Sequence, residues 1–159
     1  MKYIGLILGS ALLAAPSVVV AQDPPASGQA LSNTPEAALT AYRDAIEDLD
    51  ASGMSELFTP DSRIFENGKV EGSFANYLSH HLGPELGEFV SFDFDDLEME
   101  VKILDDVAVA SETYRYKIKL KDGRVIERSG VATSTLVQKD GGWKIMQYHS
   151  SSRIPRKAN

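Results

Sequence analysis

The first periodic pattern in the chain is helical. Apolar side chains recur every three or four positions across 39–49, and acidic residues together with Arg43 occupy the opposite side. Pro35 suits a first helical turn, and Asn33 or Thr34 before it can cap the helix. We therefore predict an amphipathic helix that begins near residue 35 and has Arg43 on its solvent face.

A second helical pattern covers residues 73–82. Its apolar stripe also includes one of the two adjacent histidines, and its members are Phe74, Tyr77, Leu78, His81 and Leu82. His80 lies about 100° around the helix from this stripe, so the two histidines are predicted to face different ways. Gly83 and Pro84 are expected to end the helix.

From Glu88 onward the hydrophobic period changes to two, which indicates strands. The alternation changes parity at Asp95-Asp96, and this predicts a β-bulge that bends a long strand. Asn67-Gly68 is typical of a two-residue hairpin turn, and Asp122-Gly123 indicates a second hairpin. With helices first and long strands afterwards, the chain is predicted to be an α+β protein: a curled antiparallel sheet with three N-terminal helices forming a cone, a cystatin-like α+β roll.

The last strand carries the third histidine, His149. Unbroken alternation places it on one face with Trp143, Ile145, Gln147 and Ser151.

The N-terminal residues do not fit this domain pattern. Lys2 is followed by an apolar run that contains no charge and leads to a small-residue pattern at Val19-Val20-Ala21. We expect a signal peptide at 1–21, a flexible linker at 22–32, one domain at 33–155 and a tail at 156–159. The mature protein would then be exported, to the periplasm if the source has an outer membrane and otherwise outside the cell.

Charge and composition narrow the function. The formal net charge is −7, so nucleic acid and anionic membranes are not expected partners. The chain has no cysteine, which excludes thiol chemistry and zinc–thiolate sites. No cofactor is expected.

Several segments resemble the nuclear transport factor 2-like, or SnoaL-like, family. They are the opening helix "TPEAALTAYRDAIEDLD", the step "LFTPDS" into a hairpin, and the terminal "GGWKI" strand. The resemblance implies a cone-shaped pocket for a small molecule and frequent homodimers through the outer sheet face. Ketosteroid isomerase-like members use a carboxylate base with a tyrosine and a protonated acid. Spacing does not select such a set among the acidic candidates Glu66, Glu71, Asp93, Asp95 and Glu112.

Three functions stay open at this point. The first is binding of a small, largely apolar ligand, with the candidate polar residues Tyr42, Tyr77, His81, Tyr114, Tyr148, His149 and Arg153. The second is a lyase or isomerase with His81 or a carboxylate as general base, and a packed core histidine is the competing interpretation of His81. The third is a metal site formed by Glu71, His81 and His149.

Overall fold

The computed structural model describes residues 32–155. The expected signal peptide, the linker up to residue 31 and the tail lie outside the described residues. Among the helices that are described, none combines the length and the apolar character needed to cross a membrane.

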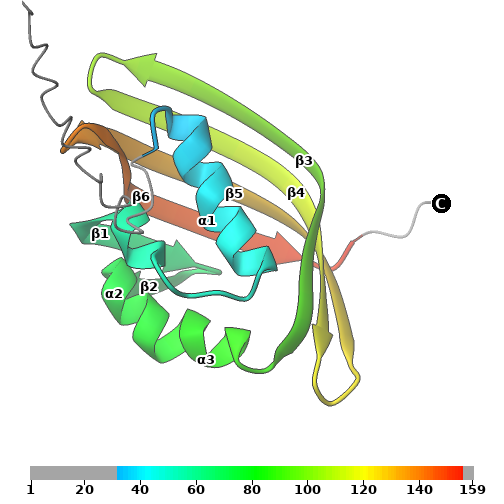
Figure 1. The fold of residues 1–159 in the computed structure, drawn as a ribbon. Coiled ribbons are helices and arrows are strands. Elements are labelled where there is room, and N and C mark those ends of the chain that lie inside the picture. Colours follow the sequence, from blue (N-terminus) through cyan, green and yellow to red (C-terminus); the bar gives the residue numbers. More distant parts are fainter. Residues whose placement is uncertain (1–31, 156–159) are drawn as a thin grey trace, which may run out of the picture.

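One six-stranded sheet forms the body of the domain, in the order β2-β1-β6-β5-β4-β3 (Figure 1). Its strands are β1 (Phe58–Glu66), β2 (Lys69–Gly72), β3 (Phe89–Leu104), β4 (Val107–Leu120), β5 (Val125–Lys139) and β6 (Gly142–Arg153). The sheet is strongly curved and the helices lie against its concave side (Figure 1). This confirms the predicted α+β fold. One detail was wrong: β1 runs parallel to β6, so the sheet is mixed rather than wholly antiparallel.

The first helix, α1 (Pro35–Glu47), begins as predicted. The Thr34 side chain accepts a hydrogen bond from the Ala37 amide at 3.1 Å and caps the helix. The predicted solvent position of Arg43 was wrong, because this side chain is buried against the sheet. Arg43 is four residues after Leu39 and three before Ile46, so helical geometry places it within the same buried stripe.

The second helical segment does not end at Gly83 and Pro84. It runs from α2 (Phe74–Tyr77) through a π-helical turn (Leu78–Leu82) into α3 (Gly83–Leu86). The Gly83 amide donates to the Leu78 carbonyl, five residues back. A side chain at position 83 would place its Cβ 2.5 Å from that carbonyl oxygen, so glycine permits the wide turn. Pro84 follows Gly83 in the first turn of α3, where proline is tolerated.

Two bulges set which side chains face the concave side of the sheet. The predicted bulge in β3 is confirmed, since the β3–β4 register shifts between Asp95 and Glu98 and Asp96 has a φ of 50°. A second bulge lies in β6: Thr135 pairs with Gln147, whereas the next residue, Leu136, pairs with Ile145. Met146 is therefore the extra residue, and side-chain parity reverses beyond it.

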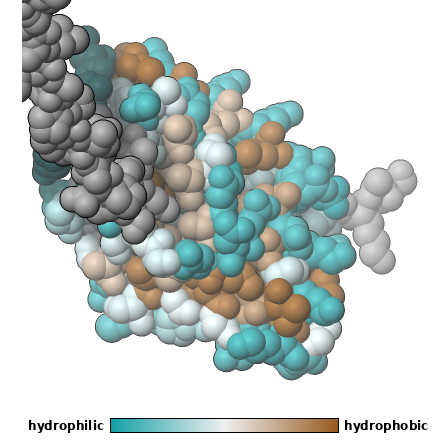
Figure 2. All heavy atoms as spheres, in the orientation of Figure 1, coloured by the Kyte–Doolittle hydropathy of each residue, from teal (hydrophilic) through white to brown (hydrophobic). Residues whose placement is uncertain are grey.

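The core fills the space between the helices and the concave face. Tyr42 of α1 makes edge contacts with the rings of Phe58 and Phe74, which stack on each other with centroids 3.7 Å apart. On the helix-covered side of the molecule, apolar side chains gather in the lower part of the surface and are bordered by hydrophilic ones (Figure 2). The aromatic packing fixes α1 and α2 relative to the sheet, and these two helices carry tyrosines of the site described next.

Candidate functional site

A small cavity of about 100 Å³ lies between α1, the second helical segment and the concave sheet face. Five tyrosines contribute to its lining: Tyr42, Tyr77, Tyr114, Tyr116 and Tyr148. Apolar side chains form much of the rest of the wall, namely Ile46, Leu82, Phe89, Phe92, Phe94 and Ile118. The cavity adjoins a groove of about 670 Å³, and the two share Glu66, Glu85, Tyr116 and Ser152 among their lining residues. We call this groove the mouth.

The cavity tyrosines are held in the neutral form. Burial is the largest cause that raises the pKa of Tyr42, Tyr77, Tyr114 and Tyr148 above the ordinary tyrosine value. For Tyr148, the neighbouring Tyr114 and a hydrogen bond to it raise the pKa further. Each hydroxyl therefore keeps its proton at neutral pH. The Tyr77 proton is donated to Glu66, and a cavity hydroxyl whose proton is not engaged in this way can donate to an oxygen atom of a ligand.

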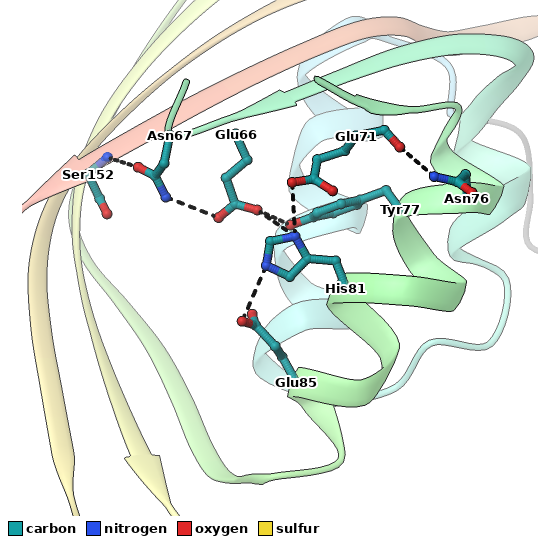
Figure 3. Close-up of polar contacts among 8 residues, drawn as sticks. All are labelled: Glu66, Asn67, Glu71, Asn76, Tyr77, His81, Glu85 and Ser152. Carbon is teal, nitrogen blue, oxygen red and sulfur yellow. Dashed lines mark hydrogen bonds and ion pairs between the residues drawn. The ribbon is translucent and has the colours of Figure 1, made fainter. Parts of the chain in front are cut away.

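Glu66 lies where the cavity meets the mouth. It is the last residue of β1, directly before the Asn67-Gly68 turn, and its Oε2 accepts a hydrogen bond from the Tyr77 hydroxyl at 2.8 Å. Its Oε1 lies 3.5 Å from the Asn67 amide nitrogen, and the Asn67 Oδ1 in turn accepts from the Ser152 backbone amide at 2.9 Å (Figure 3). These contacts orient the carboxylate, while its side chain stays 22% exposed and accessible from the mouth.

His81 lies among three carboxylates (Figure 3). Its Nδ1 is 3.3 Å from Glu71 Oε1 and 3.6 Å from Glu66 Oε2, and its Nε2 is 3.3 Å from Glu85 Oε1. Its ring also makes an edge contact with Tyr77. Burial raises the pKa of Glu85, and the nearby imidazole offsets part of that rise. We call Glu66, Glu71, His81 and Glu85 the acid–base cluster, because carboxylates and an imidazole are the side chains that most often serve as general acids and bases.

The helix-face prediction for the paired histidines agrees with the structure. The His81 side chain is 25% exposed and lines the mouth, whereas His80 is exposed and its Nδ1 contacts the Ser79 hydroxyl. The four tyrosines predicted from the sequence to contact a ligand, Tyr42, Tyr77, Tyr114 and Tyr148, all line the cavity.

Two other predicted site residues lie elsewhere. Beyond the bulge at Met146, Tyr148 faces the cavity, while His149 is exposed on the opposite sheet face near the Phe65 ring. The prediction that His149 shares a face with Trp143 and Ile145 was therefore wrong. Arg153 is also exposed, and it lines a hollow on that outer face rather than the cavity.

The metal alternative fails for the same reason. Glu71 and His81 meet at the mouth, but His149 points away from them on the other side of the sheet. Within residues 32–155, no group of three or more histidine and acidic side chains has an arrangement that could hold a metal ion.

Polar residues of the site that were not proposed from the sequence as ligand contacts include Asn67, Glu85 and Ser152. Glu85 is four residues after His81, a spacing that pairs side chains on a helix, but the helix was expected to end before it. Tyr116 has the same strand parity as Tyr114, and both rings line the cavity.

The curved sheet, the covering helices and the enclosed polar-lined cavity define a cone-shaped α+β domain. The chain belongs to the SnoaL-like domain family, whose model matches residues 36–155. No curated protein matches the sequence.

Solved structures share the fold at low sequence identity. A ketosteroid isomerase-like protein from Erwinia carotovora atroseptica is 22% identical with a TM-score of 0.65, and the match covers 76% of this chain and 94% of that one. A nuclear transport factor 2-like superfamily protein from Salmonella enterica is 18% identical with a TM-score of 0.64, covering 77% and 89%. A protein provisionally named scytalone dehydratase from Novosphingobium aromaticivorans is 13% identical with a TM-score of 0.66, covering 78% and 85%. At these identities the likeness is one of fold.

Proposed function

We propose that this domain binds a small, largely apolar molecule whose polar group lies at Glu66, Tyr77 and His81. One observation carries the proposal: the Tyr77–Glu66 hydrogen bond and the His81 ring lie where an aromatic cavity meets an open groove. The cavity alone, at about 100 Å³, has room only for a short group, whereas pockets for drug-sized ligands span about 300–1,000 Å³. The ligand therefore extends into the mouth, which at about 670 Å³ lies within that range.

Native mass spectrometry of the protein purified from its own host tests this proposal. A bound small molecule of defined mass is expected at up to one per chain, and it should be lost on denaturation. Tyr114→Trp enlarges a cavity-lining side chain and should abolish the bound mass. The control is Val131→Trp, which adds a large ring at an exposed position of β5 and should leave the bound mass unchanged. Retention of the ligand by a folded Tyr114→Trp protein would contradict the cavity assignment.

A second candidate function is proton transfer, as in a lyase or an isomerase. It is favoured by the acid–base cluster, because Glu66 is an oriented carboxylate and the cavity phenols are neutral donors for a developing oxyanion. Relatives named ketosteroid isomerase-like and scytalone dehydratase support the same class of chemistry. In this scheme Glu66 removes a proton next to a carbonyl group, a tyrosine hydroxyl donates to the enolate oxygen, and the proton returns to another carbon or assists a leaving group.

Deuterium exchange separates the two candidates. The acidic C–H groups of 2-tetralone exchange slowly in buffered D₂O, and their loss can be followed by proton NMR. A proton-transfer enzyme should accelerate this exchange, and Glu66→Gln should remove the acceleration while Glu98→Gln, an exposed change on β3, should not. If the protein binds a ligand but does not accelerate the deuterium exchange of 2-tetralone, the result supports ligand binding without proton transfer.

We also propose export and dimerisation. The charged start and apolar run at 1–21 support cleavage after Ala21, and the family resemblance supports a homodimer through the outer sheet face. N-terminal sequencing of the protein from the extracytoplasmic fraction should begin at Gln22, and light scattering should give twice the mass of the mature chain. A product that begins at Met1, or a monomer mass, would contradict the respective proposal.

A further inference from the structure

We propose that Arg128 forms an anion subsite in the mouth, so that the ligand is an apolar molecule carrying a carboxylate group. This inference rests on the proposed binding function and names the class of ligand.

Arg128 is positioned by the alternation of β5. Ile126 and Arg128 line the mouth, and Gly130, two residues further, is buried under the Tyr114 ring on the same face. The Arg128 side chain is therefore directed to the concave side of the sheet, and the residue is half-buried. An arginine in this position faces the space that a ligand would occupy, rather than bulk solvent.

Two other cations of the β4–β5 turn have partners. Arg124 pairs with Asp122 at 2.7 Å, and the Lys121 ammonium donates to the Gly87 carbonyl. Within residues 32–155, Arg128 makes no ion pair, and one of its terminal nitrogens donates to the Glu127 carbonyl at 2.9 Å. The remaining N–H groups of a guanidinium present a planar fork that fits the two oxygens of a carboxylate.

A line of polar groups connects Arg128 with the acid–base cluster. Burial raises the pKa of the Tyr116 hydroxyl, and the Arg128 charge offsets part of that rise. This hydroxyl donates to Ser152 Oγ at 2.9 Å. The Ser152 backbone amide donates to Asn67, which contacts Glu66. Arg128 thus marks a positive side of the mouth. Glu66 and Glu85 line the opposite side together with Lys69, which pairs in register with Glu66, and Glu71 lies behind them against His81.

This asymmetry fixes the orientation of the ligand. A carboxylate is repelled by the three glutamates and attracted by the guanidinium, so it binds at the Arg128 side. Phe89, Ile118 and Ile126 supply apolar wall in the same groove for the body of the molecule. A polar or reactive part of the ligand can then reach Glu66 and His81 from the cavity side.

The test compares two probes of equal shape, 2-naphthoate and neutral 2-naphthamide, with titrations monitored by NMR chemical shifts of the full mature chain. The wild type should bind naphthoate at least about tenfold more tightly, as expected for a charge-assisted pair of hydrogen bonds. Arg128→Gln should reduce this preference to about twofold or less, and Arg128→Lys should restore part of it. The control is Arg115→Gln, since Arg115 is exposed and pairs with Asp96 on the outer side; it should leave the preference unchanged.

The outcomes distinguish the two proposals. Equal affinity of the wild type for both probes, or an undiminished preference in a folded Arg128→Gln protein, overturns the anion subsite and leaves the binding function intact. If neither probe binds at millimolar concentration, the cavity does not accept an aromatic ligand, and both proposals fall.

Discussion

The guanidinium of Arg43 donates a hydrogen bond to the carboxylate of Glu112 inside the core, between α1 and β4. Both side chains are almost fully buried, with 7% and 2% of their surface exposed. A second terminal nitrogen of Arg43 donates to the Thr40 hydroxyl at 3.0 Å. The pair compensates two buried charges with each other and thereby fixes the position of the helix over the sheet.

Removal of one partner should destabilise the fold strongly. Arg43→Met leaves the Glu112 carboxylate buried without a counter-charge, and we expect a loss of about 3–5 kcal/mol in the free energy of unfolding. The double variant Arg43→Met with Glu112→Leu should recover most of this loss, because neither charge then needs compensation. Urea denaturation measures both values.

Arg115→Met is the matched control for that experiment. Arg115 pairs with Asp96 at 3.5 Å, but both side chains are more than half exposed, so the change should cost roughly 0–1 kcal/mol. If the double variant is no more stable than Arg43→Met, the uncompensated charge of Glu112 is not the cause of the stability lost in the single variant.

The cost of Arg43→Met should depend on pH. Burial raises the pKa of Glu112 from its ordinary value of 4.5, and the Arg43 charge offsets part of that rise. Without Arg43, the pKa of Glu112 in the folded state rises further. A carboxyl whose pKa is higher in the folded than in the unfolded state stabilises the fold below the unfolded-state pKa, and this stabilisation is lost as the pH rises through the folded-state pKa. The stability difference between wild type and variant should therefore grow as the pH rises from the ordinary glutamate value of 4.5 towards neutrality. A difference that stays constant across this range in urea denaturation would contradict the assignment.

The two adjacent histidines should behave differently. His81→Ala removes an imidazole from among three carboxylates and an edge contact with Tyr77, and it should lower the melting temperature by roughly 2–5 °C and weaken ligand retention. His80→Ala changes an exposed side chain and should leave both properties within error. Thermal denaturation and native mass spectrometry provide the measurements, and equal effects at both positions would refute the helix-face assignment.

Gly83→Ala should disturb the π-helical turn. The new Cβ would lie 2.5 Å from the Leu78 carbonyl oxygen, which is backbone and has to move, and we expect a loss of about 1–3 kcal/mol. The turn also sets the distance from His81 to Glu85, so the variant should weaken ligand retention beyond its effect on stability. Ser79→Ala, an exposed change within the same turn, should alter the free energy of unfolding by no more than about 0.5 kcal/mol. An unchanged Gly83→Ala protein would show that the close approach is relieved without cost.

Predictions from local patterns held where the pattern was continuous. The Asn67-Gly68 turn has positive φ at both residues, 47° and 84°, as a two-residue hairpin of this kind requires. The β3 bulge was recognisable because the apolar parity changes on its two sides. The β6 bulge left no such sign, since polar residues occupy both faces beyond Met146, and one unnoticed residue moved His149 to the wrong side of the sheet.

The sequence by itself determined most of the secondary structure, the curved α+β architecture and four of the tyrosines that line the cavity, because these follow from local periodicity and turn chemistry. Only the tertiary structure decided which charged groups meet. Arg43 and Glu112 are 69 residues apart, and His81 meets Glu66 and Glu71 only after the hairpin and the π-helical turn are in place. Hydrophobic periodicity specifies which face of an element is buried, but pairing between charges on different elements depends on register and on crossing geometry, which no local pattern records.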